Sequence, residues 1–265
     1  MCGIFGVVQK EGDVAPLIHD GLKRLEYRGY DSVGFVTLHS GSLQVRKDAG
    51  RIDDVVERLK MVEMKGSMGV GHTRWATHGA PEMVNAHPHT DCHENIALVH
   101  NGVIENFMEL KEEMIAKGHT FKSRTDTEVI AHLIEEEMKG DIGLDEAVLN
   151  SLRRLDGSYA IAVVSTSDPD KILCARQESP LVIGVSDKGA FCASDAPAML
   201  PFTNKVVYLR NGELAIIDTE GYDIRTVREG APVERELEEI TWSLEMAEKQ
   251  GYPHFMLKEI LEPPY

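Results

Sequence analysis

The chain has 265 residues, of which 44 are acidic and 28 are basic, and its formal net charge is −16. A chain of this length can bury a sizeable core in one large domain or in two small ones. Its acidic surface repels phosphate backbones and anionic lipid headgroups, and no stripe of lysine or arginine offsets that charge, so we expect neither nucleic acid nor a membrane as a partner.

The amino terminus and the cysteine content indicate the compartment. Residues 1–8 are apolar, but no basic region precedes them and no cleavage pattern follows, so they do not form a secretory signal peptide. The four cysteines are too few and too scattered for a disulfide framework. We therefore expect a cytoplasmic protein in which Cys174 and Cys192 are buried packing residues.

Strand and helix patterns alternate along the first half of the chain. Residues 3–8 predict a buried strand, and a helix capped by Asp13 follows and ends at Gly29. Further strands are expected at residues 33–38, 43–47, 68–72 and 96–100. Further helices are expected at residues 55–64, 107–117, 126–138 and 144–155.

The second half consists mainly of short β-rich runs separated by turn residues. These runs are residues 160–165, 172–176, 181–185, 190–193, 206–209 and 214–217. Such spacing is typical of antiparallel sheets, and strands that bracket helices in both halves predict an α+β protein with stacked sheets. Because the chain becomes charged near its end, we expect a core domain of residues 1–228 and an extension of residues 229–265.

Cys2 is the most informative single position. If Met1 is removed, a thiol and a free α-amine occupy one residue, and an amine with a pKa of about 8 can act as a general base. The alternative is a cysteine that only packs within an apolar strand.

The loop of residues 71–79 concentrates groups that suit an amino-acid substrate. Arg74 can hold a planar carboxylate through two parallel hydrogen bonds, and Trp75 can exclude water above it. The alternative is an exposed polar loop.

Two short motifs each admit two interpretations. Asn101 and Gly102 could donate hydrogen bonds to an oxyanion, or they could form the turn of a β-hairpin. Residues 125–128 match a capping box at the start of a helix, although the Asp126 carboxylate could also bind a substrate ammonium.

A metal site is also conceivable between residues 87 and 93. His87, His89, Cys92 and His93 offer imidazole and thiolate ligands for zinc. Their spacing matches no standard zinc pattern, and no second cysteine or histidine pair lies at a finger-like distance. We therefore expect no metal.

Taken together, six motifs resemble the class II glutamine amidotransferase family. They begin at Cys2, Tyr27, His72, Asn85, His100 and Thr125. Residues 27–32 and 252–260 favour one branch of that family, the glutaminase half of the glutamine:fructose-6-phosphate aminotransferases, over the amidophosphoribosyltransferases and asparagine synthetases.

The resemblance implies a fold and a catalytic centre. The fold is that of the N-terminal-nucleophile hydrolases, a four-layer αββα sandwich with two stacked, mainly antiparallel sheets. Cys2 would be the nucleophile, activated by its own amine. Asn101 and the N–H of Gly102 would form the oxyanion hole, and His87 would support the surrounding loop.

The resemblance also implies how the substrate is held. Arg74 would bind the α-carboxylate of L-glutamine, and Asp126 would bind its α-ammonium. Thr77 and His78 would line the site, and Trp75 would gate the passage of ammonia.

The implied reaction is hydrolysis of the glutamine side-chain amide through a thioester, without a cofactor. Members of that branch continue past residue 260 into two sugar-phosphate isomerase lobes, so we expect fructose 6-phosphate to be reached only through such lobes, and the full-length enzyme to be a dimer. The alternatives are the ammonia-donating half of another amidotransferase, a glutamine-binding module without turnover, or a zinc-binding interaction domain.

Overall fold

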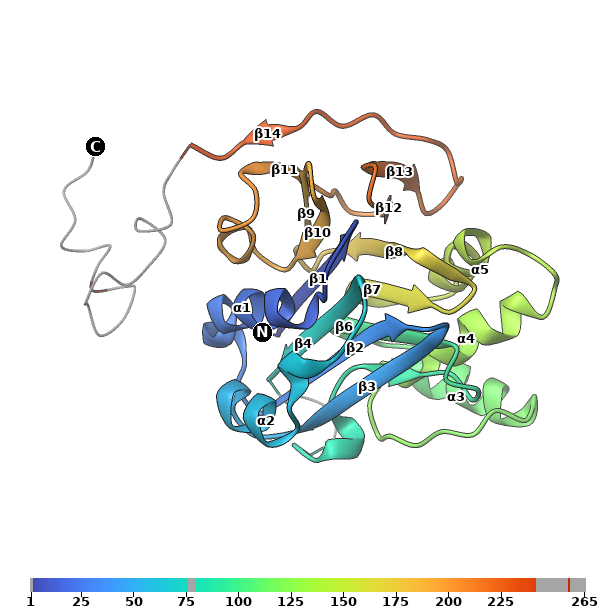
Figure 1. Cartoon of the computed structure of the whole chain (residues 1–265). Helices are drawn as coiled ribbons and strands as arrows, with labels where there is room; N and C mark the ends of the chain where they lie inside the picture. Colours follow the sequence, from blue (N-terminus) through green and yellow to red (C-terminus); the bar gives the residue numbers. More distant parts are fainter. Residues whose placement is uncertain (1, 76–79, 242–256, 258–265) are drawn as a thin grey trace.

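The computed structural model describes residues 2–75, 80–241 and 257. Two antiparallel sheets stack face to face, and helices cover their outer sides (Figure 1). The predicted four-layer αββα sandwich is confirmed. None of the helices in the described ranges is both long and apolar enough to cross a membrane.

The first sheet has eight strands and contains the amino terminus. In spatial order its strands are β14 (Glu238–Glu239), β11 (Lys205–Tyr208), β9 (Val182–Ser186), β10 (Gly189–Ala193), β1 (Gly3–Gln9), β4 (Met68–Arg74), β2 (Ser32–His39) and β3 (Ser42–Ala49). Because β1 lies in the middle of this sheet, the residue that precedes it is flanked by strands on both sides.

The second sheet has six strands. In spatial order they are β13 (Tyr222–Thr226), β12 (Glu213–Ile217), β8 (Asp168–Gln177), β7 (Gly157–Ser165), β6 (Ile96–Ile104) and β5 (His89–Thr90). Strand β6 lies near one edge and contacts β4 of the other sheet. The carboxyl half of β6 therefore lies close to the end of β4.

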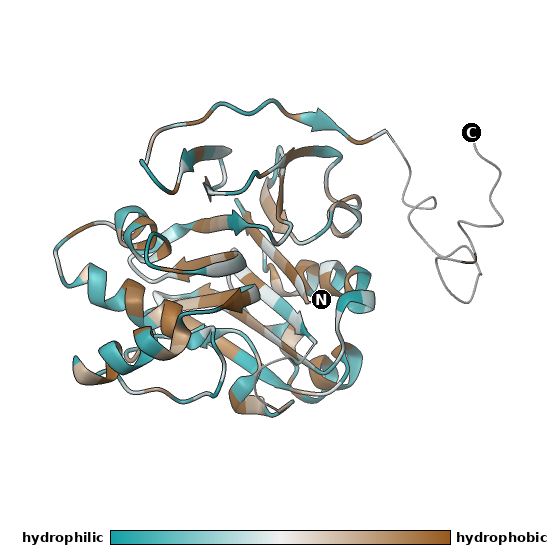
Figure 2. Ribbon diagram, turned by 180° about the vertical axis from the view of Figure 1, so that it is seen from behind, coloured by the Kyte–Doolittle hydropathy of each residue, from teal (hydrophilic) through white to brown (hydrophobic). Residues whose placement is uncertain are grey.

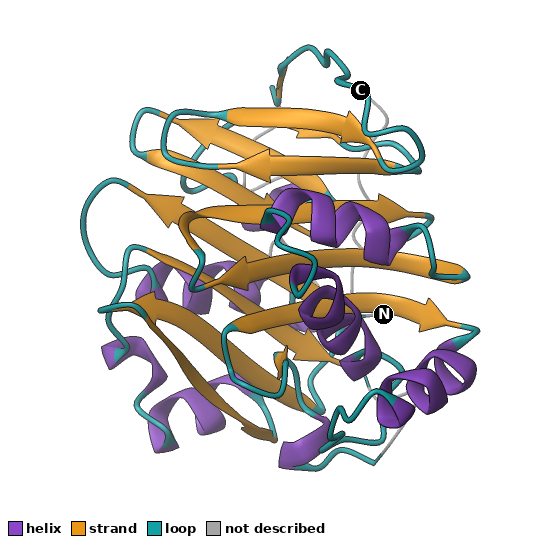
Figure 3. Ribbon diagram, turned by 90° about the vertical axis from the view of Figure 1, so that its right-hand side faces the viewer, coloured by secondary structure: helices purple, strands orange, loops and turns teal. Residues whose placement is uncertain are grey.

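In the described part of the chain, five α-helices form the two outer layers. They are α1 (Ala15–Arg24), α2 (Ile52–Arg58), α3 (Phe107–Ala116), α4 (Glu128–Met138) and α5 (Leu144–Leu152), and short 3-10 helices occur at Glu26–Arg28, Met61–Glu63, Met83–Asn85 and Ala196–Ala198. Helices α1 and α2 cover the eight-stranded sheet, and α3 to α5 cover the other, in front of its strands in Figure 3.

The alternation of side chains along each strand explains the layers. On β1, Phe5 and Val7 pack against α1 and α2, whereas Ile4 and Val8 pack between the two sheets. Both faces of the strand are therefore buried, which is why its sequence is a continuous apolar run. Figure 2 shows the same distribution, with hydrophobic colour on the strands and hydrophilic colour on the outer sides of the helices.

Some local predictions are wrong. Asp13 does not cap α1, because Val14 is the N-cap residue and the Asp13 carboxylate accepts hydrogen bonds from Gly66 N and Lys65 Nζ. The interpretation of Asn101 and Gly102 as a hairpin turn is also wrong, since both residues lie within β6. Three short strands, β5, β13 and β14, had no recognisable pattern.

The predicted division of the chain at residue 228 stays a prediction. Before residue 241 the chain returns to the eight-stranded sheet, where β14 pairs with β11 and Ile240 is buried against the helix layer.

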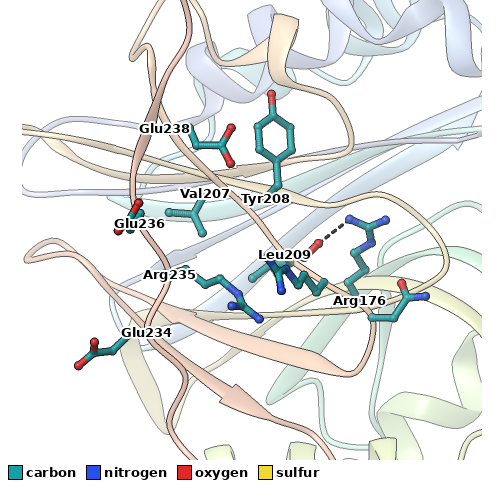
Figure 4. A pocket seen from close by; sticks show the side chains of 10 residues that line it. Arg176, Val207, Tyr208, Leu209, Glu234, Arg235, Glu236 and Glu238 are labelled. Atoms are coloured by element: carbon teal, nitrogen blue, oxygen red, sulfur yellow. Dashed lines mark hydrogen bonds between the residues drawn. The ribbon is translucent and has the colours of Figure 1, made fainter.

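The segment that leads to β14 closes a groove of about 770 Å³ beside the loop between β11 and β12 (Figure 4). Two charged side chains that line this groove have partners within the protein. Arg235 pairs with Glu213, and Arg176 donates a hydrogen bond to Leu209 O. The predicted catalytic residues do not line this groove.

Candidate active site

Cys2 lies immediately before β1, against the end of β4. Gly3 pairs with Thr73, so the thiol of Cys2 reaches the next residues of that strand. Its Sγ accepts a hydrogen bond from Trp75 N at 3.2 Å and lies 3.6 Å from Trp75 O. Its carbonyl oxygen accepts hydrogen bonds from Arg28 Nε and Asn101 Nδ2, each at 3.0 Å. The candidate nucleophile is thus held by both sheets.

The surroundings of the Cys2 thiol favour its protonated form. Burial raises the pKa of this thiol, although the N–H of Trp75 and the nearby guanidinium groups of Arg74 and Arg28 oppose that shift. A thiol in such a site needs a base to take its proton.

Asn101 connects the two sheets at the site. Its Oδ1 lies 3.0 Å from His72 Nε2, and its Nδ2 donates to Cys2 O and to Ser194 Oγ, the latter at 2.8 Å. An amide nitrogen has two hydrogens, and both are used in this arrangement. Asn101 therefore positions Cys2 here, and its role as an oxyanion donor stays a prediction.

Gly102 occupies a backbone conformation that only glycine adopts readily. Its φ is 133°, and a Cβ at this position would lie 2.0 Å from Ser158 O on β7. At Gly102, one residue beyond Asn101, the backbone of β6 is therefore packed closely against β7.

A layer of four buried imidazoles lies behind Asn101. His72 and His87 stack with their ring centroids 4.2 Å apart, His89 packs edge-on against His87 at 4.8 Å, and His100 N donates to His87 Nδ1 at 3.2 Å. Burial lowers the pKa of His72 to about 3, that of His87 and His89 well below the usual value, and that of His100 as well. These rings are neutral near pH 7, and the role of His87 in supporting the loop stays a prediction.

The two proposed ligands for the substrate zwitterion are Arg74, on the eight-stranded sheet, and Asp126, in the loop before α4. Arg74 ends β4 and is 4% exposed, and burial lowers the pKa of its guanidinium while the charges of Cys2 and Asp126 oppose that shift. The carboxylate of Asp126 accepts a hydrogen bond from Ile104 N at 2.8 Å. Arg74 is therefore within electrostatic reach of both Cys2 and Asp126.

The other predicted residues of the loop are placed only in part. Trp75 is 46% exposed, and its ring packs edge-on against Tyr30 at 5.6 Å. Thr77 and His78 lie outside the described residues. Their roles, like that of Trp75 as a gate, stay predictions.

The capping box predicted for residues 125–128 is absent from the structure. Helix α4 begins at Glu128 without a side-chain cap, and the Glu128 carboxylate accepts hydrogen bonds from Lys122 N and Ser123 N instead. The Thr125 hydroxyl bonds to His89 Nε2 at 3.0 Å. This segment thus connects the start of α4 to the imidazole layer.

Sequence reasoning missed two residues that follow β10. Ser194 Oγ accepts hydrogen bonds from Ile4 N and Asn101 Nδ2, each at 2.8 Å. Asp195 accepts a hydrogen bond from Tyr27 OH at 2.5 Å and pairs with Arg28 Nη1 at 3.5 Å. Tyr27 and Arg28 belong to a recognised motif, but no sequence pattern marked Ser194 and Asp195.

Comparison with known proteins gives consistent similarities. A family model described as a glutamine amidotransferase domain matches residues 72–201. The whole chain is 56% identical to the glutamine–fructose-6-phosphate aminotransferase (isomerizing) of Thermococcus kodakarensis and 52% identical to that of Pyrococcus horikoshii, and it spans 44% of the length of each.

Solved structures show the same fold. The glutamine phosphoribosylpyrophosphate amidotransferase of B. subtilis matches with a TM-score of 0.73 and 30% identity, covering 85% of this chain and 49% of that one. A glutamine aminotransferase class-II domain protein from Silicibacter pomeroyi matches with a TM-score of 0.59 and 16% identity, over 85% of this chain and 99% of that one. The second similarity concerns the fold alone.

Proposed function

Because the chain belongs to the class II glutamine amidotransferase domains, we propose that it hydrolyses the side-chain amide of L-glutamine to glutamate and ammonia, with Cys2 as the nucleophile. The observation that carries this proposal is the position of the Cys2 thiol. The thiol lies at the head of the central strand β1, near the Arg74 guanidinium, and the backbone carbonyl of the same residue accepts a hydrogen bond from Asn101 Nδ2 of the other sheet.

Removal of Met1 precedes the reaction and frees the α-amine of Cys2. That amine takes the thiol proton, and the thiolate attacks the amide carbon of glutamine. The tetrahedral oxyanion accepts a hydrogen bond from Gly102 N–H, and Asn101 contributes a second one by exchanging its bond to Cys2 O or Ser194 Oγ. The protonated amine then returns a proton to the leaving nitrogen, ammonia departs, and water hydrolyses the thioester to glutamate.

Substrate selection follows from the charges around the thiol. Arg74 presents a planar guanidinium to the α-carboxylate, and Asp126 presents a carboxylate to the α-ammonium. Both are nearly buried, so each opposite charge of the zwitterion is bound away from bulk water. Thr77 and His78 complete the lining, and Trp75 gates the passage of ammonia.

The fate of the ammonia depends on the whole protein. Identity of 47 to 56% to glutamine–fructose-6-phosphate aminotransferases, against 30% to the phosphoribosylpyrophosphate amidotransferase, supports delivery of ammonia to fructose 6-phosphate in the full-length enzyme, which we propose is a dimer. The sugar phosphate would bind to isomerase lobes and not to this domain.

The test is an assay for ammonia release from glutamine, made with the wild type and with Cys2→Ala. The variant should bind glutamine but release ammonia at no more than a few per cent of the wild-type rate. Cys174→Ala is the matched control, because it removes a thiol that is buried between the sheets. Mass spectrometry of the amino terminus shows whether Met1 has been removed. Ammonia release that survives Cys2→Ala would contradict the proposal.

A further inference from the structure

A second group of ligating side chains lies outside the candidate active site. Cys92, His119, His132 and Glu135 direct one ligand atom each toward a common point, with all four atoms within 4.8 Å of one another. We propose that this group, the Cys92 cluster, binds one zinc ion with a structural role.

The distances within the Cys92 cluster fit a tetrahedral ion. Cys92 Sγ lies 3.7 Å from His119 Nδ1 and 3.5 Å from His132 Nδ1. Glu135 Oε2 lies 2.9 Å from His119 Nδ1 and 3.3 Å from His132 Nδ1. Ordinary zinc bond lengths in a tetrahedron place sulfur and nitrogen about 3.6 Å apart, and nitrogen and oxygen about 3.3 Å apart. Of these four pairs, the one between His119 Nδ1 and Glu135 Oε2 must open by a few tenths of an ångström, and the other three already have the required separation.

The groups behind the ligands are those that metal sites use. His119 Nε2 lies 3.0 Å from Glu136 Oε2, so the ring can donate there while Nδ1 faces the ion. Thr120 N donates to Cys92 Sγ at 3.5 Å, which stabilises a thiolate. The second oxygen of Glu135 is bound by His93 Nδ1 at 2.8 Å. Oε2 accepts a hydrogen bond from Cys92 N at 3.1 Å and keeps a further lone pair for the ion.

The alternative is a cluster held by hydrogen bonds alone. In that case each ring nitrogen of His119 faces a carboxylate oxygen, of Glu135 on one side and of Glu136 on the other. Both nitrogens would then have to carry hydrogens. A metal ion removes this requirement, since Nδ1 coordinates as a neutral imidazole and only Nε2 donates.

The position of the cluster indicates a structural role. Cys92 lies between β5 and β6, His119 lies between α3 and α4, and His132 and Glu135 lie one turn apart on α4. The histidines and Glu135 are buried and Cys92 is partly buried, and four protein ligands leave no open position for a substrate. Zinc would therefore cross-link the loop before β6 to helix α4. Strand β6 carries Asn101, and α4 follows Asp126.

This assignment differs from the metal site considered on sequence spacing. His87 and His89 belong to the imidazole layer, and His93 contacts the far oxygen of Glu135. The ligands proposed here are 27, 40 and 43 residues from Cys92, so their spacing along the chain gave no zinc signature.

The experiment uses the whole chain, stripped with a chelator and titrated with Co²⁺ and then Zn²⁺. We expect one equivalent of Co²⁺ per chain, with the near-ultraviolet absorption band of a cobalt thiolate and the visible bands of a tetrahedral ion, and both should disappear when Zn²⁺ is added. Zn²⁺ should also raise the Tm of the stripped protein.

Variants separate zinc binding from simple hydrogen bonding. Cys92→Ser should lose the thiolate band, and Glu136→Gln, which keeps all four ligands, should weaken Zn²⁺ binding by about 10- to 100-fold. Cys2→Ala is the matched control, because it removes the candidate nucleophile and should keep the cobalt spectrum unchanged. A wild-type protein that binds Co²⁺ without the thiolate band, or equal Zn²⁺ affinity in wild type and Glu136→Gln, would overturn the proposal.

Discussion

Acid should destabilise this protein at a pH well above the range in which carboxylates titrate. The imidazole layer is the reason, because His72, His87 and His89 are fully buried and burial depresses their pKa values. A histidine in the unfolded chain has a pKa of about 6.5, so the unfolded state binds protons that the folded state does not. As the pH falls below about 6.5, the free energy of unfolding must therefore fall.

The magnitude follows from the linkage between protons and folding. Each such histidine contributes a slope of about 1.4 kcal/mol per pH unit, from the unfolded pKa down to the folded one. For His72 the folded pKa is about 3, so its full slope holds at pH 5. Between pH 6.5 and 5.0 this amounts to about 2 kcal/mol for His72, and His87 and His89 add to the loss in the same direction. Such a loss is a substantial fraction of the usual stability of a domain.

Carboxylates cannot account for a loss in this window. Interactions with His132 and with backbone N–H groups of residues 122 and 123 hold the pKa of Glu128 at about 2 in spite of its burial. Such a group stabilises the fold above its unfolded pKa of about 4.3, and its contribution is lost only as the pH falls below that value. In protein stripped of metal, in which the Cys92 cluster has no zinc to release, the slope between pH 6.5 and 5.0 therefore reports the buried histidines.

The assay is urea unfolding at pH 7.0, 6.0 and 5.0, followed by circular dichroism. His72→Gln should reduce the slope by about 1.4 kcal/mol per pH unit, whatever it does to the stability at pH 7. His39→Gln is the control, because His39 is exposed at the end of β2 and should leave the slope unchanged. A free energy of unfolding that stays constant between pH 6.5 and 5.0 would refute the reasoning.

Three further predictions concern the candidate site. Arg74→Gln and Asp126→Asn should each raise the KM for glutamine by roughly 30-fold or more, because each leaves one charge of the bound zwitterion without its partner. Arg74→Lys should restore binding only in part, since an ammonium cannot reproduce the planar fork of a guanidinium; an unchanged KM in Arg74→Gln or Asp126→Asn would exclude that residue as a ligand. Gly102→Ala should lower the Tm and abolish ammonia release, since its Cβ would lie 2.0 Å from Ser158 O at a φ of 133°; a wild-type Tm would show that the β6 backbone can shift. The chain alone should hydrolyse glutamine without forming glucosamine 6-phosphate and without acceleration by fructose 6-phosphate, and detection of that product would reveal an acceptor site within these residues.

Most of the strands and helices could be predicted from the sequence, because their signals are contained within a few consecutive residues. The apolar run of residues 3–8 becomes β1, and the turn at Ser40 and Gly41 joins β2 to β3, with both residues at positive φ as such hairpins require. Helices α3, α4 and α5 follow their apolar periodicity to within a few residues. The motifs around Cys2, Arg74 and Asn101 also indicated the family before any contact between them was known.

Which of these residues lie in contact depends on the tertiary structure. Strand register and the stacking of two sheets bring Ser194 to Asn101, 93 residues away along the chain, and they bring His119 and His132 to Cys92. Pairing with β7 also keeps Asn101 and Gly102 within strand β6, although an Asn-Gly dipeptide alone favours a hairpin turn. Such contacts depend on the summed packing of many side chains across the sandwich, and no short stretch of sequence contains that information.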